Sequence, residues 1–237
     1  MPGAGVSALS HVENSFLLMS WMEPLRFKDT LPSHFGLKAI GHFLAIPCFF
    51  AAYFIVAYYP VRSITPMPVF APDRWAPLLP WTVWVYFSLW VYICLPSTLI
   101  ESKGLLKQYF RGAFWMAAIG IAIFIVFPTS TPQWTADWAG YPGTLTFMKD
   151  AELSRNACPS LHVSFALFTA LWLDWLLRRI RATAPWRWGN ALWAAAIIVT
   201  TLTTKQHVFI DVVFGVLLGG AIFAVNMYWV WRDQRLA

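Results

Sequence analysis

Two residues near the C-terminal end of the chain could form a nucleophile and the group that orients it. His207 and Asp211 are spaced i, i+4 and therefore share one face if this stretch is helical. Asp211 could then accept the Nδ1–H of His207 and leave Nε2 facing outward as a nucleophile, as in a catalytic triad. Lys205 adds a positive charge two residues before the histidine. A structural His–Asp hydrogen bond that caps a helix is the alternative interpretation of the same pattern.

A second stretch, Cys-Pro-Ser-Leu-His at positions 158–162, could bind an anion and move a proton. Proline favours the first position of a helix, so we expect a helix to start near Pro159. The unpaired backbone N–H groups of such a helix start bind phosphate, and the Ser160 hydroxyl could add a donor. His162 would lie just inside and could exchange a proton near neutral pH. Taken alone, the stretch is also typical of a helix cap followed by an interfacial histidine.

The composition indicates that these residues are carried by a membrane protein. Hydrophobic residues make up 59% of the 237 residues and charged residues only 12%, against about 25% charged residues in soluble domains. The 15 tryptophans fit aromatic rings placed at lipid–water interfaces. The net charge of +6 does not indicate nucleic-acid binding, because the basic residues lie between apolar runs. The expected partner is the membrane bilayer.

Six apolar windows approach the roughly 20 residues that a membrane-spanning helix requires. They are Ile40–Tyr59, Leu78–Ile100, Tyr109–Phe127, Pro159–Leu177, Trp188–Thr204 and Val208–Val230. The fifth window is the weakest, because it is short and rich in threonine at its end. We therefore predict an all-α, polytopic bundle of about six transmembrane helices in residues 38–237. Residues 1–37 are expected to form an N-terminal cytoplasmic or interfacial segment.

The basic residues orient this bundle in the membrane. With the N-terminus inside, 12 of the 17 lysines and arginines fall on inner segments and 5 on outer ones. Because Lys and Arg gather on the cytoplasmic side of membranes, both termini are expected to be cytoplasmic. The segments that carry His162 and His207 then begin on the same outer side. This side is the periplasm if the chain lies in a bacterial inner membrane.

The predicted bundle would bring together, at its outer side, two histidines, a carboxylate and the N-terminus of a helix that can bind phosphate. This combination of groups suits phosphoryl transfer. Such chemistry depends on positioning and charge neutralisation more than on covalent chemistry from the protein. The chain's other three histidines have no carboxylate partner at the same spacing. No metal and no cofactor are expected, because the chain has no His-x-x-x-His pair, no Cys-x-x-Cys pair and no acidic cluster with ligand spacing.

Together, the two stretches resemble the signature motifs of the type 2 phosphatidic acid phosphatase (PAP2) superfamily, Pro-Ser-Gly-His and Ser-Arg-x5-His-x3-Asp. Here they read Pro-Ser-Leu-His at 159–162 and His-x-x-x-Asp at 207–211. The resemblance covers roughly Arg111 to Tyr228 and implies a PAP2-like core of six membrane helices. Three features look more like the branch of the superfamily that contains inositol phosphorylceramide synthase. They are Leu161, the Lys-Gln-His in the last motif and the stretch Phe127-Pro128-Thr129.

The resemblance also implies a role for each residue of the two motifs. His207 would attack phosphorus and form a phosphohistidine, and Asp211 would orient it. His162 would protonate the leaving alcohol, and Ser160 would bind phosphate oxygens.

The chain departs from the family at its phosphate-binding basic residues. The Ser-Arg of the last motif falls on Thr200 and Thr201, and the early Lys-x6-Arg-Pro motif is absent. Lys205 lies four residues after Thr201 and could supply the missing charge. Lys149 and Arg155, in the outer loop, are further candidates, although both could also be solvated loop charges.

The leading function is therefore an integral membrane, PAP2-type phosphatase acting on a lipid phosphate or diphosphate. A lipid phosphotransferase of the inositol phosphorylceramide synthase type would differ only in its acceptor, an alcohol instead of water. A proton-coupled transporter would favour charges near the membrane midplane and repeated halves. An intramembrane serine protease with Ser160 as nucleophile would be expected to carry Gly-x-Ser. The identity of the lipid, the acceptor and the oligomeric state are left open.

Overall fold

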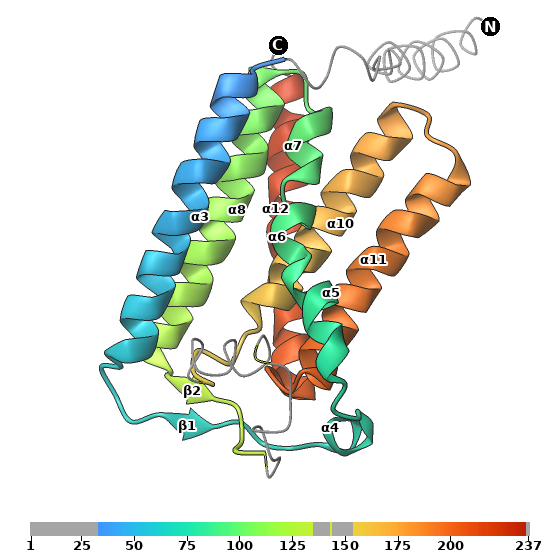
Figure 1. The fold of residues 1–237 in the computed structure, drawn as a ribbon. Coiled ribbons are helices and arrows are strands. Elements are labelled where there is room, and N and C mark those ends of the chain that lie inside the picture. Colours follow the sequence, from blue (N-terminus) through green and yellow to red (C-terminus); the bar gives the residue numbers. More distant parts are fainter. Residues whose placement is uncertain (1–32, 135–142, 144–153, 236–237) are drawn as a thin grey trace, which may run out of the picture.

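The computed structural model describes residues 33–134, 143 and 154–235, which form a bundle of helices (Figure 1). The elements are, in order, α3 (Phe35–Tyr58), β1 (Thr65–Pro66), α4 (Ala71–Trp75), the 3-10 helix η1 (Pro80–Thr82), α5 (Val83–Phe87), α6 (Leu89–Tyr92), α7 (Leu95–Leu99), α8 (Lys103–Val126), β2 (Thr129–Ser130), α10 (Leu161–Arg179), α11 (Ala184–Thr203) and α12 (Phe209–Arg235). Most of the predicted segment 1–37 lies outside the described residues.

The predicted all-α membrane bundle is confirmed. Among the described residues, five segments are long and apolar enough to cross a membrane: Phe35–Tyr58, Pro80–Leu99, Lys103–Val126, Leu161–Arg179 and Phe209–Asp233. The fifth predicted window does form a helix, α11, but this helix is not among the five. Its polar residues are used for packing: Asn190 donates to the carbonyl of Ala170 at 2.9 Å and accepts a hydrogen bond from the Tyr92 hydroxyl.

The second span is a succession of short helices, η1, α5, α6 and α7, where the sequence predicts one continuous helix. Pro80 and Pro96 each lie at the start of one of these pieces, since proline cannot donate a helical hydrogen bond. The Ser88 hydroxyl donates to the Val85 carbonyl at 2.6 Å between α5 and α6, a bond that often bends a helix.

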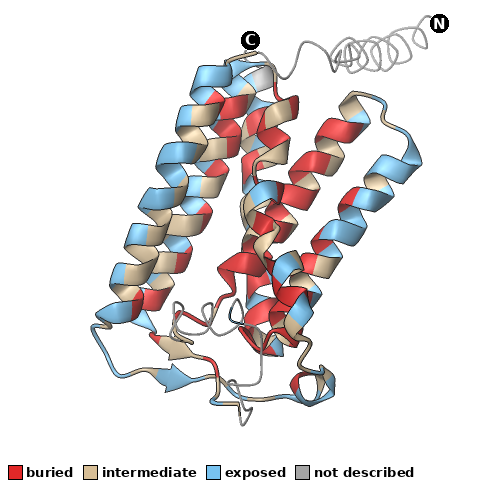
Figure 2. Cartoon of the chain, in the orientation of Figure 1, coloured by how far each residue is buried: buried red, intermediate tan, exposed pale blue. Residues whose placement is uncertain are grey.

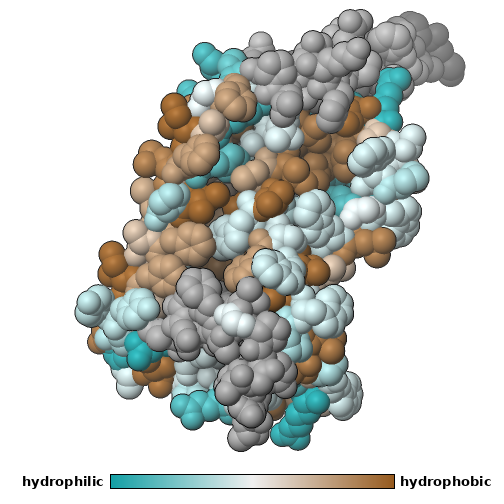
Figure 3. All heavy atoms as spheres, in the orientation of Figure 1, coloured by the Kyte–Doolittle hydropathy of each residue, from teal (hydrophilic) through white to brown (hydrophobic). Residues whose placement is uncertain are grey.

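Helix α10 lies at the centre of the bundle, in contact with α6, α7, α8, α11 and α12. Figure 2 shows its buried residues along most of its length, whereas α3 is largely exposed. The exposed residues of α3 include large apolar side chains such as Phe43, Leu44 and Ile55. Figure 3 shows apolar side chains spread over the flank of the bundle, as expected for a surface covered by lipid.

Helices α10 and α12 approach each other closely because α12 presents glycine at the contact. A Cβ atom added at Gly215 would lie 2.6 Å from the Ser160 carbonyl oxygen, and one at Gly219 would lie 2.5 Å from that of Ser164. The Ser164 hydroxyl donates to the carbonyls of Ser160, at 2.9 Å, and Gly215, at 3.0 Å. These contacts hold the first turns of the two helices side by side.

The connections that the charge distribution assigns to the outer side lie at one end of the bundle (Figure 1). There β1 and β2 pair in parallel, with Thr65 opposite Thr129 and Pro66 opposite Ser130. The start of α3 and the end of α12 lie at the opposite end. We call the end with the strands the outer end of the bundle.

Candidate active site

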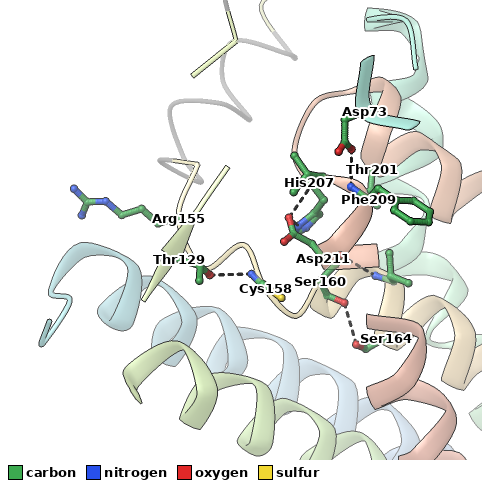
Figure 4. A network of polar contacts seen from close by, with 12 residues as sticks. Asp73, Thr129, Arg155, Cys158, Ser160, Ser164, Thr201, His207, Phe209 and Asp211 are labelled. Atoms are coloured by element: carbon green, nitrogen blue, oxygen red, sulfur yellow. Dashed lines mark hydrogen bonds and ion pairs between the residues drawn. The ribbon is translucent and has the colours of Figure 1, made fainter. Parts of the chain in front are cut away.

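The structure brings His207 and Asp211 together at the outer end, as their spacing predicts (Figure 4). The Nδ1 atom of His207 lies 3.5 Å from Asp211 Oδ2, within ion-pair distance and longer than a typical hydrogen bond. Asp211 is fully buried in the first turn of α12, and its Oδ2 accepts the N–H of Val208 at 3.0 Å. A buried carboxylate beside a ring nitrogen can fix the imidazole tautomer, leaving Nε2 unprotonated.

Ser160 also belongs to this group, although α10 does not start where the sequence predicts. The helix begins at Leu161, and Ser160 is its N-cap, with Oγ accepting the N–H of Val163 at 3.3 Å. The Ser160 N–H is not free for phosphate, because it donates to the Asp211 carbonyl at 3.0 Å. Pro159 precedes the cap and follows a cis peptide bond. The first-turn N–H groups without an intrahelical acceptor are therefore those of Leu161 and His162.

His162 is held by the broken second span. Its Nε2 lies 3.0 Å from the Tyr86 carbonyl oxygen, and its ring stacks on the Tyr86 ring with centroids 3.6 Å apart. Trp90 meets the same imidazole edge-on, with centroids 5.9 Å apart. Because a carbonyl oxygen can only accept, Nε2 carries the hydrogen, and Nδ1 is the atom that can exchange a proton.

The two histidines line one cavity. The remaining lining residues, contributed mainly by α3, α5, α6 and α10, are mostly aromatic: Phe49, Phe50, Tyr53, Phe54, Tyr86, Leu89, Trp90, Asn156, Leu161 and Phe165. The cavity thus combines two groups capable of proton transfer with an apolar wall on the side of α3.

Lys205 points its ammonium group towards α4. Its Nζ donates to the carbonyls of Asp73, at 2.8 Å, and Ala76, at 2.6 Å, and lies 4.5 Å from the centroid of the Trp134 ring. Burial lowers the pKa of Lys205, and the negative charge of Asp73 opposes that shift. Its predicted role in binding phosphate stays a prediction, with at least two of its donors turned to protein carbonyls.

Arg155, a second predicted phosphate ligand, is not brought to the histidines. The Arg155 guanidinium donates to the Ala57 carbonyl at 2.8 Å, near the end of α3, and Figure 4 shows it pointing away from His207 and Asp211. Lys149 lies outside the described residues.

Asp73, which the sequence analysis missed, makes a direct contact with the turn that carries His207. It is buried, and its Oδ1 accepts the N–H of Phe209 at 2.6 Å (Figure 4). Its Oδ2 accepts the N–H of Phe70 at 2.8 Å. In a proline-rich loop, a single aspartate looks like a solvated charge, so the sequence offers no signal for this contact.

Two further residues beside the pair were also missed. Both amide atoms of Gln206 are buried without a hydrogen-bond partner. Cys158, whose N–H donates to Thr129 Oγ1 at 2.9 Å, has its thiol near Asp211. Burial and, after it, the nearby charge of Asp211 raise the pKa of Cys158 to about 12, so the thiol is neutral at physiological pH.

Comparison with known proteins points to the same part of the chain. Residues 125–235 match the family model of the PAP2 superfamily. This range holds α10, α11 and α12, and with them Ser160, His162, His207 and Asp211. No curated protein and no solved structure matches the chain. The C-terminal part of this membrane protein, including its two histidines, is thus similar to the PAP2 superfamily.

Proposed function

We propose that this protein is a PAP2-type phosphatase that cleaves lipid phosphates or diphosphates through a phosphohistidine at His207. The observation that carries the proposal is that His162 and His207 line the same cavity, whose other lining residues are mostly aromatic. A polar head group would meet the histidines while the hydrocarbon chain lies against the aromatic wall. The match of residues 125–235 to the PAP2 superfamily supports phosphatase or phosphotransferase chemistry.

The proposed reaction has two steps. In the first, His207 Nε2 attacks phosphorus and the bond from phosphorus to the leaving oxygen breaks, while a doubly protonated His162 gives its Nδ1 proton to that oxygen. Asp211 stabilises the positive charge that develops on the His207 ring. In the second step, a water molecule gives a proton to His162 and attacks the phosphohistidine, which releases inorganic phosphate and restores both rings.

Uncharged hydrogen-bond donors at the outer end could bind phosphate oxygens in place of the arginines that bind phosphate in the PAP2 superfamily. Ser160 Oγ accepts the Val163 N–H, so its own hydrogen remains available for donation. Buried polar atoms without a hydrogen-bond partner include Thr131 Oγ1, Trp134 Nε1 and both amide atoms of Gln206. Since unsatisfied buried polar groups are rare, they favour a polar ligand at this end. Lys149 remains a candidate for supplying a charge.

A phosphotransferase would use the same first step and then pass the phosphorus-bearing group to an alcohol. The Leu161 and Lys-Gln-His features favour this second candidate, because they resemble the inositol phosphorylceramide synthase branch. Leu161 also lines the cavity, next to His162.

Purified protein in detergent or nanodiscs, incubated with a panel of lipid monophosphates and diphosphates, tests both candidates. A phosphatase releases inorganic phosphate without added alcohol, whereas a transferase forms a new phosphate ester of the acceptor only when an alcohol is present. His207→Ala is the control and should abolish either product. Turnover by the wild type that equals that of His207→Ala on every substrate would refute the proposed chemistry.

A further inference from the structure

The short helix α4 reaches from the first outer connection to the turn that carries His207. This turn joins the end of α11 at Thr203 to the start of α12 at Phe209. Two polar contacts between α4 and the turn lie on either side of His207, one at Lys205 and one at Phe209. We call Asp73, Lys205 and the Phe209 N–H, with the bonds that join them, the α4 clasp.

The Asp73 carboxylate joins the start of α4 to the start of α12. It accepts two backbone hydrogen bonds, from Phe70 at 2.8 Å and from Phe209 at 2.6 Å, while being almost fully buried. The Phe209 N–H belongs to the first turn of α12, where no helical carbonyl can accept it. Asp73 therefore caps α12 across 136 positions of sequence. Hydrogen bonds to an ionised carboxylate are about twice as strong as neutral ones.

Lys205 closes the clasp on the other side of the histidine. Its ammonium donates to the carbonyls of Asp73 and Ala76 at the C-terminal end of α4, where carbonyl groups lack helical partners. The Lys205 backbone has a φ of 57°, in the left-handed region, which reverses the chain just before His207. The position of the turn is thus set by bonds to α4, by the backbone bond from the His207 N–H to the Thr201 carbonyl at 3.1 Å and by the bond from the Val208 N–H to Asp211 Oδ2.

The orientation of the His207 ring depends on where this turn lies. The Asp211 backbone is held by α10, because its carbonyl accepts the Ser160 N–H, while its Oδ2 is bound to the turn through the Val208 N–H at 3.0 Å. The 3.5 Å separation between His207 Nδ1 and Asp211 Oδ2 therefore changes if the turn shifts relative to α12. A displacement of about 1 Å at a reacting group can cost on the order of 100-fold in rate.

We propose that Asp73 is a positioning residue for His207, acting through the Phe209 N–H, and that Lys205 supports it from the other end of the turn. The inference deepens the proposed function by assigning the first outer connection to the assembly of the nucleophile. It makes Lys205 a positioning residue instead of a ligand of the phosphate.

The test compares Asp73→Ala, Asp73→Asn, Lys205→Met and Lys205→Arg with the matched control Asp174→Asn. Asp174 is also a carboxylate with two partners, Arg178 and Arg187, but it lies near the inner end of α10. We expect Asp73→Ala to lower kcat by about 10- to 100-fold while KM changes less than threefold, since the turn moves but the cavity wall stays. Asparagine keeps one acceptor oxygen and should lose less, and Lys205→Arg should retain more activity than Lys205→Met. Asp174→Asn should keep the wild-type kcat.

A second readout does not require activity. Nitrogen-15 NMR of histidine-labelled protein reports the ring tautomer, and the His207 signal is identified by its loss in His207→Gln. We expect one Nδ1–H tautomer in the wild type and a broadened or mixed signal in Asp73→Asn and Lys205→Met. An unchanged His207 signal in both variants would overturn the proposal, as would a wild-type kcat in both. If no lipid phosphate is a substrate but the signal changes, the proposed function fails and the positioning role stands.

Discussion

At the scale of single residues, the two histidines are held in different ways. His207 is paired with the buried carboxylate of Asp211, whereas His162 donates to a backbone carbonyl and stacks on the Tyr86 ring. A carboxylate stabilises the positive charge that develops on the ring during attack and remains in the phosphohistidine. A neutral carbonyl fixes the direction of the ring and the nitrogen that carries its hydrogen. The two residues should therefore respond differently to substitution.

The first prediction concerns the covalent intermediate. Rapid quenching of wild-type protein with labelled substrate should trap a phosphoenzyme that is acid-labile and alkali-stable, as expected for a phosphoramidate. His207→Ala should abolish it. Asp211→Asn should leave the fold intact but lower turnover by several orders of magnitude, because the ring loses its orienting charge. Label recovered on Ser160, stable to acid, would assign the nucleophile to serine.

His162→Ala should affect substrates according to their leaving groups. An alkyl phosphate needs protonation of the departing oxygen, so its turnover should fall by about 100- to 10,000-fold. A nitrophenyl ester or a diphosphate departs without that proton, and its turnover should fall far less. Brønsted plots of rate against leaving-group pKa, measured for the wild type and for His162→Ala, check this. Equal slopes for the two proteins would contradict the role assigned to His162.

Activity should not depend on a metal ion. The sequence lacks ligand spacing, and no group of three or more His, Cys, Asp or Glu side chains in the described residues could hold one. Turnover should survive a strong chelator, and vanadate should inhibit by adopting the five-coordinate geometry of the transition state. Inactivation by chelator that is reversed by zinc or magnesium would argue for a different mechanism.

At the scale of the elements, local sequence patterns predict the helices but not the contacts that refine the site. Apolar runs predict the spans, and the His-x-x-x-Asp spacing predicts the buried pair, because both depend on residues close in sequence. The interruption of Pro80–Leu99 depends on the hydrogen bond that the Ser88 hydroxyl donates, and the start of α10 at Leu161 depends on the one that the Asp211 carbonyl accepts. Asp73 and Tyr86 act through contacts 136 and 76 positions away, which no local pattern records.

The contact between α10 and α12 predicts a sharp difference between adjacent glycines. Gly219→Ala would bring Cβ to 2.5 Å from the Ser164 carbonyl, so the helices would have to separate. We expect a loss of about 1–3 kcal/mol in stability, measured as a lower Tm in detergent. Gly220→Ala is the control, since its Cβ would meet only Leu167 at 3.9 Å. Equal Tm values for the two variants would contradict this packing.

At the scale of the whole molecule, the site lies at the end that the charge distribution assigns to the outside. Ser63→Cys, in the exposed connection at that end, should react with a membrane-impermeant maleimide in intact cells. Thr183→Cys, between α10 and α11, should react only after lysis, because it lies at the opposite end. Both are made in a background without the three native cysteines. The reverse labelling pattern would place the site in the cytoplasm.

The long sequence separations within the site have a consequence for biosynthesis. Asp73 meets Phe209 and Ser160 meets Asp211, so the clasp and the His207–Asp211 pair await α12, whereas Tyr86 can meet His162 before α12 is made. Domains that are still being synthesised can form only the contacts already available to them. A nascent chain that ends before residue 209 holds both histidines but neither the carboxylate nor the clasp. Ribosome-bound chains should thus be inert towards the lipids around them until α12 has entered the membrane.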